Sequence, residues 1–154
     1  MLKSNSGMSE CDSAPQPRNP ENTDKLKYRG CHCMLDYTKC YIKEKDTEAT
    51  CLALFNGFKE ICGNNNLRIV GEKMVVFDGS VSPPGFSFIA MLDESHISFH
   101  SYGEQGISGI DCFTCSKNPE NHINAVSDIK KLMAHHFPEG ELLTHHSVGR
   151  FATL

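Results

Sequence analysis

The sequence predicts an α+β fold, a two-layer sandwich with helices on one face of a largely antiparallel sheet. Two segments carry apolar residues at helical spacing, from Thr47 to Cys62 and from Pro119 to about His136. The strand-like segments are short, and most of them follow one another through short polar connections, which favours antiparallel pairing. We write the resulting element order as β-α-β-β-β-α-β.

Both predicted helices have recognisable ends. Gly63 and the three asparagines after it predict a stop for the first helix. Pro119 suits the first turn of the second helix, where its missing N–H leaves no bond unmade. The apolar positions of the first helix are Cys51, Leu52, Leu54, Phe55, Phe58, Ile61 and Cys62. Those of the second are Ile123, Val126, Ile129, Leu132 and Met133.

Strands are predicted where residues alternate or where apolar residues run together. Ile97 and Phe99 share one face of such a segment, because strand side chains alternate. Ser80 to Gly85 is predicted as a loop, and Gly103 to Gly106 as a turn. The predicted strands are 31–36, 67–77, 86–92, 96–100, 107–114 and 142–148.

The chain divides into an arm and one domain. Residues 1–27 hold Ser, Asn, Pro, Asp and Glu but few large apolar residues, so they are predicted to be disordered. Residues 28–154 form the predicted domain. The whole chain of 154 residues, 39% of them hydrophobic, is long enough for one domain with a real core.

Charge and cysteine content limit the partners and the compartment. A net charge of −4 provides no basic field, so no nucleic-acid partner is predicted. No apolar run spans a bilayer and the first residues lack the apolar stretch of a secretory signal, so we expect a cytoplasmic protein without a membrane partner. Its eight cysteines are then expected to be free thiols, with Cys51 and Cys62 buried in the first helix.

The densest cluster of reactive side chains lies between Ser87 and Cys115. Residues 94–100 read ESHISFH, which has the pattern E-S-H-x-x-x-H, and Glu104 follows four positions later. Residues 111–115 read DCFTC, which has the pattern D-x-F-T-C. These three elements at this spacing resemble the S-adenosylmethionine decarboxylase family in its short prokaryotic form, and the resemblance extends more weakly from about residue 28 to residue 151.

The resemblance implies an enzyme that makes its own prosthetic group, a pyruvoyl. The Ser95 hydroxyl attacks the carbonyl of Glu94 and turns the amide into an ester. Loss of the Ser95 Cα proton expels Glu94 as a carboxylate, so the chain is cut between these residues. The dehydroalanine that remains tautomerises and hydrolyses to a pyruvoyl group and ammonia. Its keto group forms a Schiff base with the substrate amine, and the pyruvoyl accepts the electron pair left on the substrate's Cα when CO2 departs.

The same resemblance implies the remaining roles. His100 is the base that assists processing, and Ser87 is a serine that assists it too. Cys115 is the proton donor to the substrate's Cα. Tyr102 stacks on adenine, and Glu104 contacts the substrate, at its ribose hydroxyls. For four of these positions an ordinary role stays open: His100 as an exposed histidine, Cys115 as a buried thiol, Ser87 as a hydroxyl bonded to the backbone and Glu104 as a solvated turn residue.

The substrate implied is S-adenosylmethionine, whose decarboxylated product is the aminopropyl donor of spermidine synthesis. Two departures bear on it: Gly103 replaces the proline of the family's H-T-x-P-E pattern, and Val81 stands where the family commonly has an aromatic. A lost stacking face costs about 1 kcal/mol. L-Arginine or L-ornithine is therefore the alternative substrate for the same chemistry. The resemblance also implies a homodimer with active sites shared across its interface.

A zinc or redox module is a more distant alternative. Cys112 and Cys115 form a C-x-x-C pair, and Cys31 and Cys33 could complete four zinc ligands only if the two strands are neighbours. No metal site is predicted.

Two further interpretations remain. The histidine pairs 135–136 and 145–146 are predicted to lie on the surface, because adjacent residues point apart and offer at most one ligand to a given site. An inactive homologue is a third class of protein, and the presence of Ser95, His100 and Cys115 argues against it.

Overall fold

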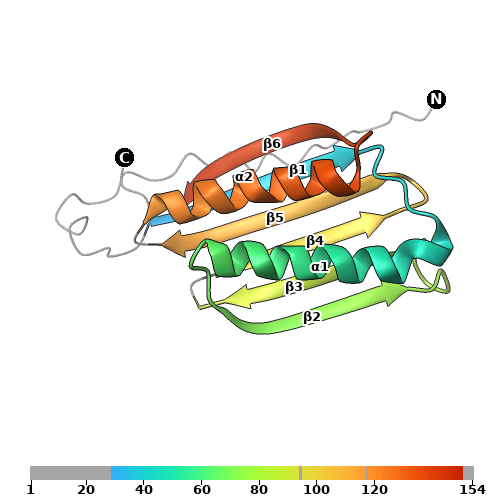
Figure 1. Cartoon of the computed structure of the whole chain (residues 1–154), viewed down its shortest axis with the longest axis horizontal. Helices are drawn as coiled ribbons and strands as arrows, with labels where there is room; N and C mark the ends of the chain where they lie inside the picture. The colour runs from blue at the N-terminus through green and yellow to red at the C-terminus, as the bar shows by residue number, and fades with distance from the viewer. Residues whose placement is uncertain (1–28, 94, 117, 151–154) are drawn as a thin grey trace, which may run out of the picture.

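The computed structural model describes residues 29–93, 95–116 and 118–150 (Figure 1). The predicted arm, residues 1–27, and Glu94 lie outside the described residues. The elements in chain order are β1 (Arg29–Thr38), η2 (Glu44–Asp46), α1 (Thr47–Asn64), β2 (Ile69–Phe77), β3 (Gly85–Leu92), β4 (Ser95–Tyr102), β5 (Ile107–Ser116), α2 (Pro119–His136) and β6 (Glu141–Arg150).

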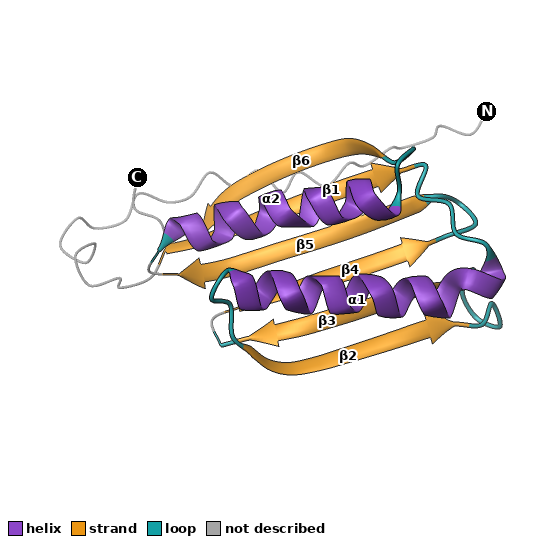
Figure 2. Ribbon diagram, in the orientation of Figure 1, coloured by secondary structure: helices purple, strands orange, loops and turns teal. Residues whose placement is uncertain are grey.

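The strands form one sheet in the order β2-β3-β4-β5-β1-β6, and each neighbouring pair is antiparallel. Helices α1 and α2 lie across one face of this sheet (Figure 2). The predicted two-layer α+β sandwich is therefore confirmed. The predicted element order is one strand short, because segments 86–92 and 96–100 are the two separate arms of a hairpin and four strands stand between the helices.

Helix α1 ends within the predicted stop, and an asparagine of that stretch closes it. The helix continues through Gly63 to Asn64, and the side chain of Asn65 then donates a hydrogen bond of 2.9 Å to the carbonyl of Ile61. The same carbonyl accepts the Asn65 backbone N–H at 3.1 Å, so Asn65 closes the helix with both its backbone and its side chain. The side-chain amide group donates to Asp128 of α2 at 3.1 Å, so Asn65 also joins the two helices.

Helix α2 begins at Pro119, as the sequence predicts. The Asn118 side chain accepts a hydrogen bond of 3.1 Å from the Glu120 backbone N–H, which satisfies one of the helix's first donors. Proline at the first helical position then loses nothing, because its missing N–H would have had no helical partner.

The core lies between the helices and the sheet. Phe86, Phe88 and Phe99 stack nearly parallel across β3 and β4, and Phe58 of α1 meets two of these rings edge-on. All four rings are at most 3% exposed. Cys51 and Cys62 are fully buried, as predicted, and burial raises the pKa of each thiol to about 11. These two cysteines therefore act as small apolar residues of the core.

The opposite face of the sheet, which we call the open face, is covered by neither helix (Figure 1). On β4, Ile97 and Phe99 point into the core while His96, Ser98 and His100 lie on the open face. Apolar side chains are exposed there from several strands. They are Val75, Ile89, Met91, Ile107, Leu143 and Val148.

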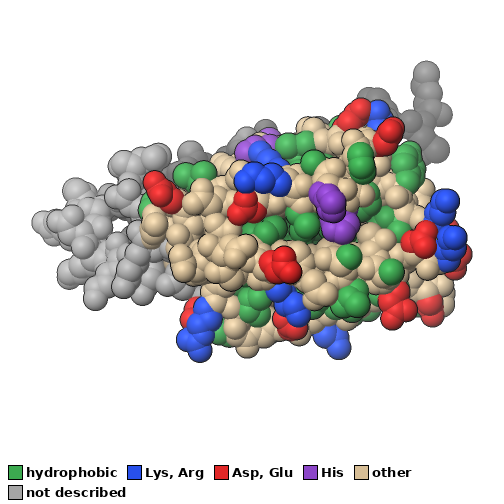
Figure 3. All heavy atoms as spheres, in the orientation of Figure 1, with side chains coloured by type: hydrophobic (Ala, Val, Ile, Leu, Met, Phe, Trp, Pro, Cys, Tyr) green, Lys and Arg blue, Asp and Glu red, His purple; other side chains and the backbone are tan. Residues whose placement is uncertain are grey.

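The side of the molecule that carries the helices has a mixed surface. Lys and Arg side chains lie among Asp and Glu side chains there, without a patch of one sign (Figure 3). Within the described part of the chain, no helix is long and apolar enough to cross a membrane.

Candidate active site

Ser95 is the first residue of β4, directly after a two-residue hairpin loop. Leu92 of β3 pairs with Ser95, so only positions 93 and 94 connect the two strands. The Asp93 N–H donates to the Arg68 carbonyl at 3.1 Å, and the Arg68 guanidinium donates to the Asp93 carboxylate at 3.3 Å. These two bonds hold the start of the loop. Ser95 itself is half-buried.

Cys115 lies at the same end of the sheet as Ser95. His96 of β4 pairs with Phe113 of β5, and Cys115 stands two residues beyond Phe113. By strand alternation, Cys115 shares the open face with Phe113 and Asp111. Its side chain is partly exposed, so a substrate can reach the thiol.

Ser87 and His100 form a second group. The two residues pair directly across β3 and β4, and the Ser87 hydroxyl forms a hydrogen bond with Nδ1 of His100. The His100 ring lies between two aromatic rings, with centroid distances of 4.6 Å to Tyr102 and 5.6 Å to Phe77. A hydroxyl and an imidazole in this arrangement can pass a proton between them.

The predicted site residues thus fall into two groups within one chain. Ser95 and His100 are five positions apart on one strand, which separates their Cα atoms by about 16 Å. Ser95 and Cys115 lie at one end of the sheet, where strand alternation turns Ser95 toward the side of Ile97 and Phe99 and Cys115 toward the open face. Ser87 contacts His100, which packs against Tyr102. The structure does not bring the two groups together.

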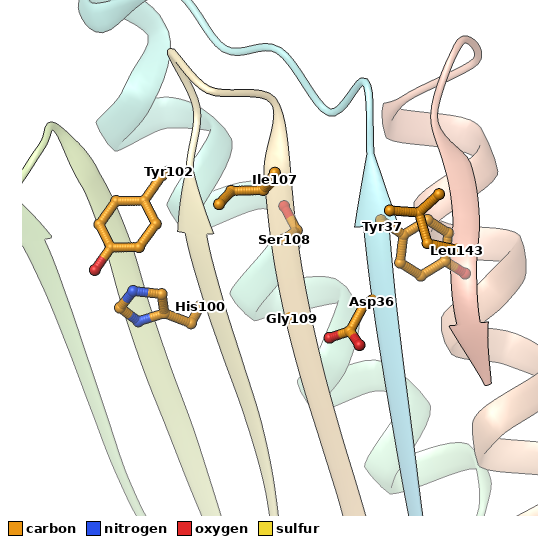
Figure 4. Close-up of a pocket in the computed structure, with 8 residues that line it drawn as sticks. All are labelled: Asp36, Tyr37, His100, Tyr102, Ile107, Ser108, Gly109 and Leu143. Atoms are coloured by element: carbon orange, nitrogen blue, oxygen red, sulfur yellow. The ribbon is translucent and has the colours of Figure 1, made fainter. Parts of the chain in front are cut away.

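A pocket of about 300 Å³ opens beside His100 and Tyr102 (Figure 4). Gly109 of β5 pairs with both His100 and Asp36, and its missing side chain leaves the hollow between them. The lining residues are Asp36, Tyr37, His100, Tyr102, Ile107, Ser108, Gly109 and Leu143. Glu104 is exposed in the turn that follows Tyr102 and does not line this pocket.

The two departures from the family pattern have different structural settings. A Cβ atom at Gly103 would lie 2.6 Å from Cβ of Ile42, so the tight packing of Ile42 against the turn explains the glycine. Val81 lies in the loop before β3 and is 96% exposed, so its side chain packs against no part of the site. Phe77 stands beside His100 instead, a contact that the position of Phe77 in the sequence does not predict.

Several polar residues near the Cys115 end were missed from the sequence. His32 of β1 lies 3.0 Å from Asp111 of β5 through its Nε2 atom, and both His32 and His96 contact the ring of Phe113. The Arg150 guanidinium lies 5.0 Å from the centre of that ring. Alternation along β1 and β5 could have assigned these side chains to faces, but only the strand pairing shows that they meet.

A buried histidine was also missed. His122 of α2 is 6% exposed, and its Nδ1 atom lies 2.9 Å from the Thr114 hydroxyl. Burial lowers the pKa of His122, and the nearby His32 lowers it further. A neutral imidazole is therefore favoured, and this hydrogen bond ties the first part of α2 to the end of β5.

The cysteines in the described part of the chain do not meet in the arrangement that a zinc or redox centre needs. The strands that carry them are neighbours, and Cys33 pairs with Cys112. Both of these thiols face the core, whereas Cys115 lies on the open face. Burial is the largest cause that raises the pKa of Cys33 and Cys112, which disfavours the thiolate that metal binding or redox exchange requires. No group of three ligating side chains within the described segments could hold a metal ion.

The predicted surface histidines are confirmed for three of the four positions. His135, His145 and His146 are exposed, and His136 is half-buried at the end of α2. Burial lowers the pKa of His136, and the neighbouring His135 adds to this effect.

Comparison with known proteins shows which family this sequence matches. A sequence model described as S-adenosylmethionine decarboxylase matches residues 31–142. The S-adenosylmethionine decarboxylase proenzyme of Methanococcus aeolicus is 32% identical over 108 residues, which cover 69% of this chain and 86% of the relative. That of Clostridium botulinum is 30% identical over 92 residues, or 60% and 73% of the two chains.

The fold has a solved counterpart as well. The crystal structure of the adenosylmethionine decarboxylase from Aquifex aeolicus VF5 matches with a TM-score of 0.57 at 18% identity, over 82% of this chain and 92% of that one. The sheet, its two helices and the matched segment define an α+β enzyme of the carboxy-lyase class. The chain belongs to the S-adenosylmethionine decarboxylase family.

Proposed function

We propose that this protein cuts itself between Glu94 and Ser95, carries a pyruvoyl group at position 95, and decarboxylates S-adenosylmethionine. The observation that carries the proposal is the place of Ser95, at the first position of a strand after a two-residue loop, with the Cys115 thiol at the same end of the sheet. The product, a decarboxylated sulfonium, is an aminopropyl donor of the kind that spermidine synthesis uses. Residues 1–27 precede the catalytic domain as an arm.

A hairpin loop is a favourable place for such a cut. The ladder between β3 and β4 runs from the Leu92–Ser95 pair to the Phe86–Ser101 pair, and β5 pairs with β4 from the other side. Cleavage between positions 94 and 95 therefore breaks no strand pairing. The two chains, 1–94 and 95–154, stay joined by the sheet, and the new end remains where the cut placed it.

The residues around position 95 fit a pyruvoyl group. The group supplies a keto carbon that captures the substrate amine and an electron sink for the charge left after CO2 departs. Cys115 holds the proton that returns to the substrate's Cα, and its partial exposure lets the substrate reach it. Ser87 and His100 hold a mobile proton between a hydroxyl and an imidazole, as processing requires.

A second copy of the chain could bring a His100 group close to Ser95, which a single chain keeps apart. About 16 Å along β4 separates Ser95 from His100, which is too far for one to act on the other. The open face exposes a set of apolar side chains, as a surface that binds another subunit does. Two open faces packed about a two-fold axis would set the Ser95 end of one protomer against the His100 end of its partner. We propose that the enzyme is this homodimer, with each active site made from both chains.

A mixed dimer tests the shared site. We expect Ser95→Ala and His100→Ala chains, each expressed alone, to remain uncut. When the two are co-expressed with different tags, one of the two sites in a mixed dimer has both an intact Ser95 and an intact His100. The His100→Ala chain in that dimer should then be cut, while the Ser95→Ala chain stays whole. A denaturing gel will therefore show cleavage of at most half of the chains in the mixed dimers. Isolated mixed dimers that stay uncut would contradict the shared site.

The substrate is proposed from the aromatic side chains of the second group. Phe77, His100 and Tyr102 line up on the open face beside a pocket of about 300 Å³. Aromatic faces suit a purine, whereas arginine and ornithine have no ring to stack on them. Phe77 provides the aromatic surface that Val81 lacks, so the adenosyl substrate is favoured over a basic amino acid.

Release of CO2 from S-adenosylmethionine, L-arginine and L-ornithine, measured in parallel, tests this choice. We expect turnover of S-adenosylmethionine with a kcat/KM at least about 100-fold above that of either amino acid, because only the adenosyl group fills the aromatic pocket. Preferential turnover of arginine or ornithine would instead establish the alternative substrate.

The compartment is proposed from the thiols. No disulfide joins any of the seven described cysteines, although Cys33 and Cys112 lie directly opposite each other on neighbouring strands. Free thiols are typical of a reducing compartment, so we propose that the enzyme works in the cytoplasm.

A further inference from the structure

Three strands place Cys115 and Arg150 on one line across the open face. Gly30 of β1 pairs with Cys115 of β5 on one side and with Arg150 of β6 on the other. Directly paired residues share a face of the sheet, so all three belong to the open face. Cys115 and Arg150 are thus separated only by a residue without a side chain.

Gly30 is the gap that lets these two side chains approach. A Cβ atom at Gly30 would lie 2.9 Å from Cβ of Arg150 and 3.0 Å from Sγ of Cys115. Cβ of Arg150 and Sγ of Cys115 therefore both lie next to the space that a side chain at position 30 would fill. Any other residue at position 30 would stand between them.

The arginine side chain uses this gap to cross a strand. Arg150 starts on β6, yet its guanidinium carbon lies 5.0 Å from the centre of the Phe113 ring on β5. It therefore reaches over β1 to the strand that carries Cys115. Phe113 is two positions from Cys115 on the same face, and a cation over an aromatic ring is held there by the ring's negative face.

We propose that Arg150 stabilises the thiolate that Cys115 becomes when it gives up its proton. This inference rests on the proposed function, in which Cys115 protonates the substrate. In that step the S–H bond breaks, a C–H bond forms at the substrate's Cα, and the electron pair of the S–H bond stays on sulfur. A guanidinium nearby favours the developing negative charge, which makes the thiol a better proton donor near neutral pH.

Other charged groups also face Cys115 in the described part of the sheet. They are His32 on β1, Asp111 on β5 and His96 on β4. Asp111 is 3.0 Å from His32, so its negative charge is directed to that imidazole. Unlike these three groups, the Arg150 guanidinium carries a permanent positive charge in a protein.

The test is the pH dependence of Cys115 alkylation, read on the Cys115 peptide by mass spectrometry. It is measured on the full chain carrying Ser95→Ala, which forms no pyruvoyl, so the result does not depend on turnover. We expect Arg150→Met to move the midpoint of alkylation upward by about half to one pH unit. Arg150→Lys keeps a positive charge, so its midpoint should stay close to that of the parent chain. In processed enzyme without Ser95→Ala, Arg150→Met should lower kcat with little change in KM.

Lys73→Met is the matched control, because Lys73 is an exposed cation on β2 at the far edge of the same sheet. It should leave the midpoint unchanged. An Arg150→Met midpoint equal to that of the parent chain would overturn the proposal. Failure of the proposed function would show separately, as absence of CO2 release by the processed parent enzyme.

Discussion

Ser95→Ala should leave the chain in one piece and without decarboxylase activity. The change removes the hydroxyl that attacks the preceding carbonyl in the proposed reaction, so the ester cannot form and no pyruvoyl results. Ser95 is half-buried at the start of β4 and the substitution removes a single oxygen atom, so the variant should keep its fold. A denaturing gel and CO2 release measure the two losses.

Ser98→Ala is the matched control for this variant. Ser98 lies on the same strand, on the open face, and is also half-buried. It should be cut normally. Cleavage of the Ser95→Ala chain at the same bond would show that another residue is the nucleophile.

Cys115→Ala should be cut normally but turn over slowly. Its thiol is the proposed proton donor, and loss of a positioned acid typically costs about 100-fold to 10,000-fold in rate. Processing should persist, because Cys115 lies at the Ser95 end of the sheet and the proposed processing base is His100. Gel analysis of cleavage and kcat for S-adenosylmethionine together measure this separation.

Cys31→Ala is the control for the loss of a thiol at this end of the sheet. Cys31 is one residue from Gly30, partly exposed, and points toward the helices instead of the open face. It should keep nearly full turnover. Normal turnover of Cys115→Ala would remove Cys115 from the mechanism.

The fold followed from the sequence where side chains carry the signal. Helix α2 begins and ends at the predicted residues because Asn118 and Pro119 mark its start and the apolar stripe runs to its end. Five of the six strands were predicted too short, as β1 shows with its extra residues at each end of 31–36, whereas β2 was predicted two residues too long at its start. Strand ends are held by backbone bonds to neighbours, which leave little trace in the side chains.

The site was less predictable, because a motif gives spacing along the chain and no distance in space. Ser95 and His100 belong to one seven-residue pattern, yet they stand about 16 Å apart on an extended strand. Phe77 and Arg150 meet the site only through the register of β2 with β3 and of β6 with β1. That register is set by long-range packing, which a single sequence does not reveal.

The most direct test of self-cleavage at Ser95 is the intact mass of the purified protein under denaturing conditions. We predict two chains, one spanning residues 1–94 with a free carboxylate at Glu94, and one spanning 95–154 with a pyruvoyl group in place of its first serine. That second chain should resist N-terminal sequencing, because it has no terminal amine. A single species with the mass of the full chain, as an inactive homologue would have, would contradict the account.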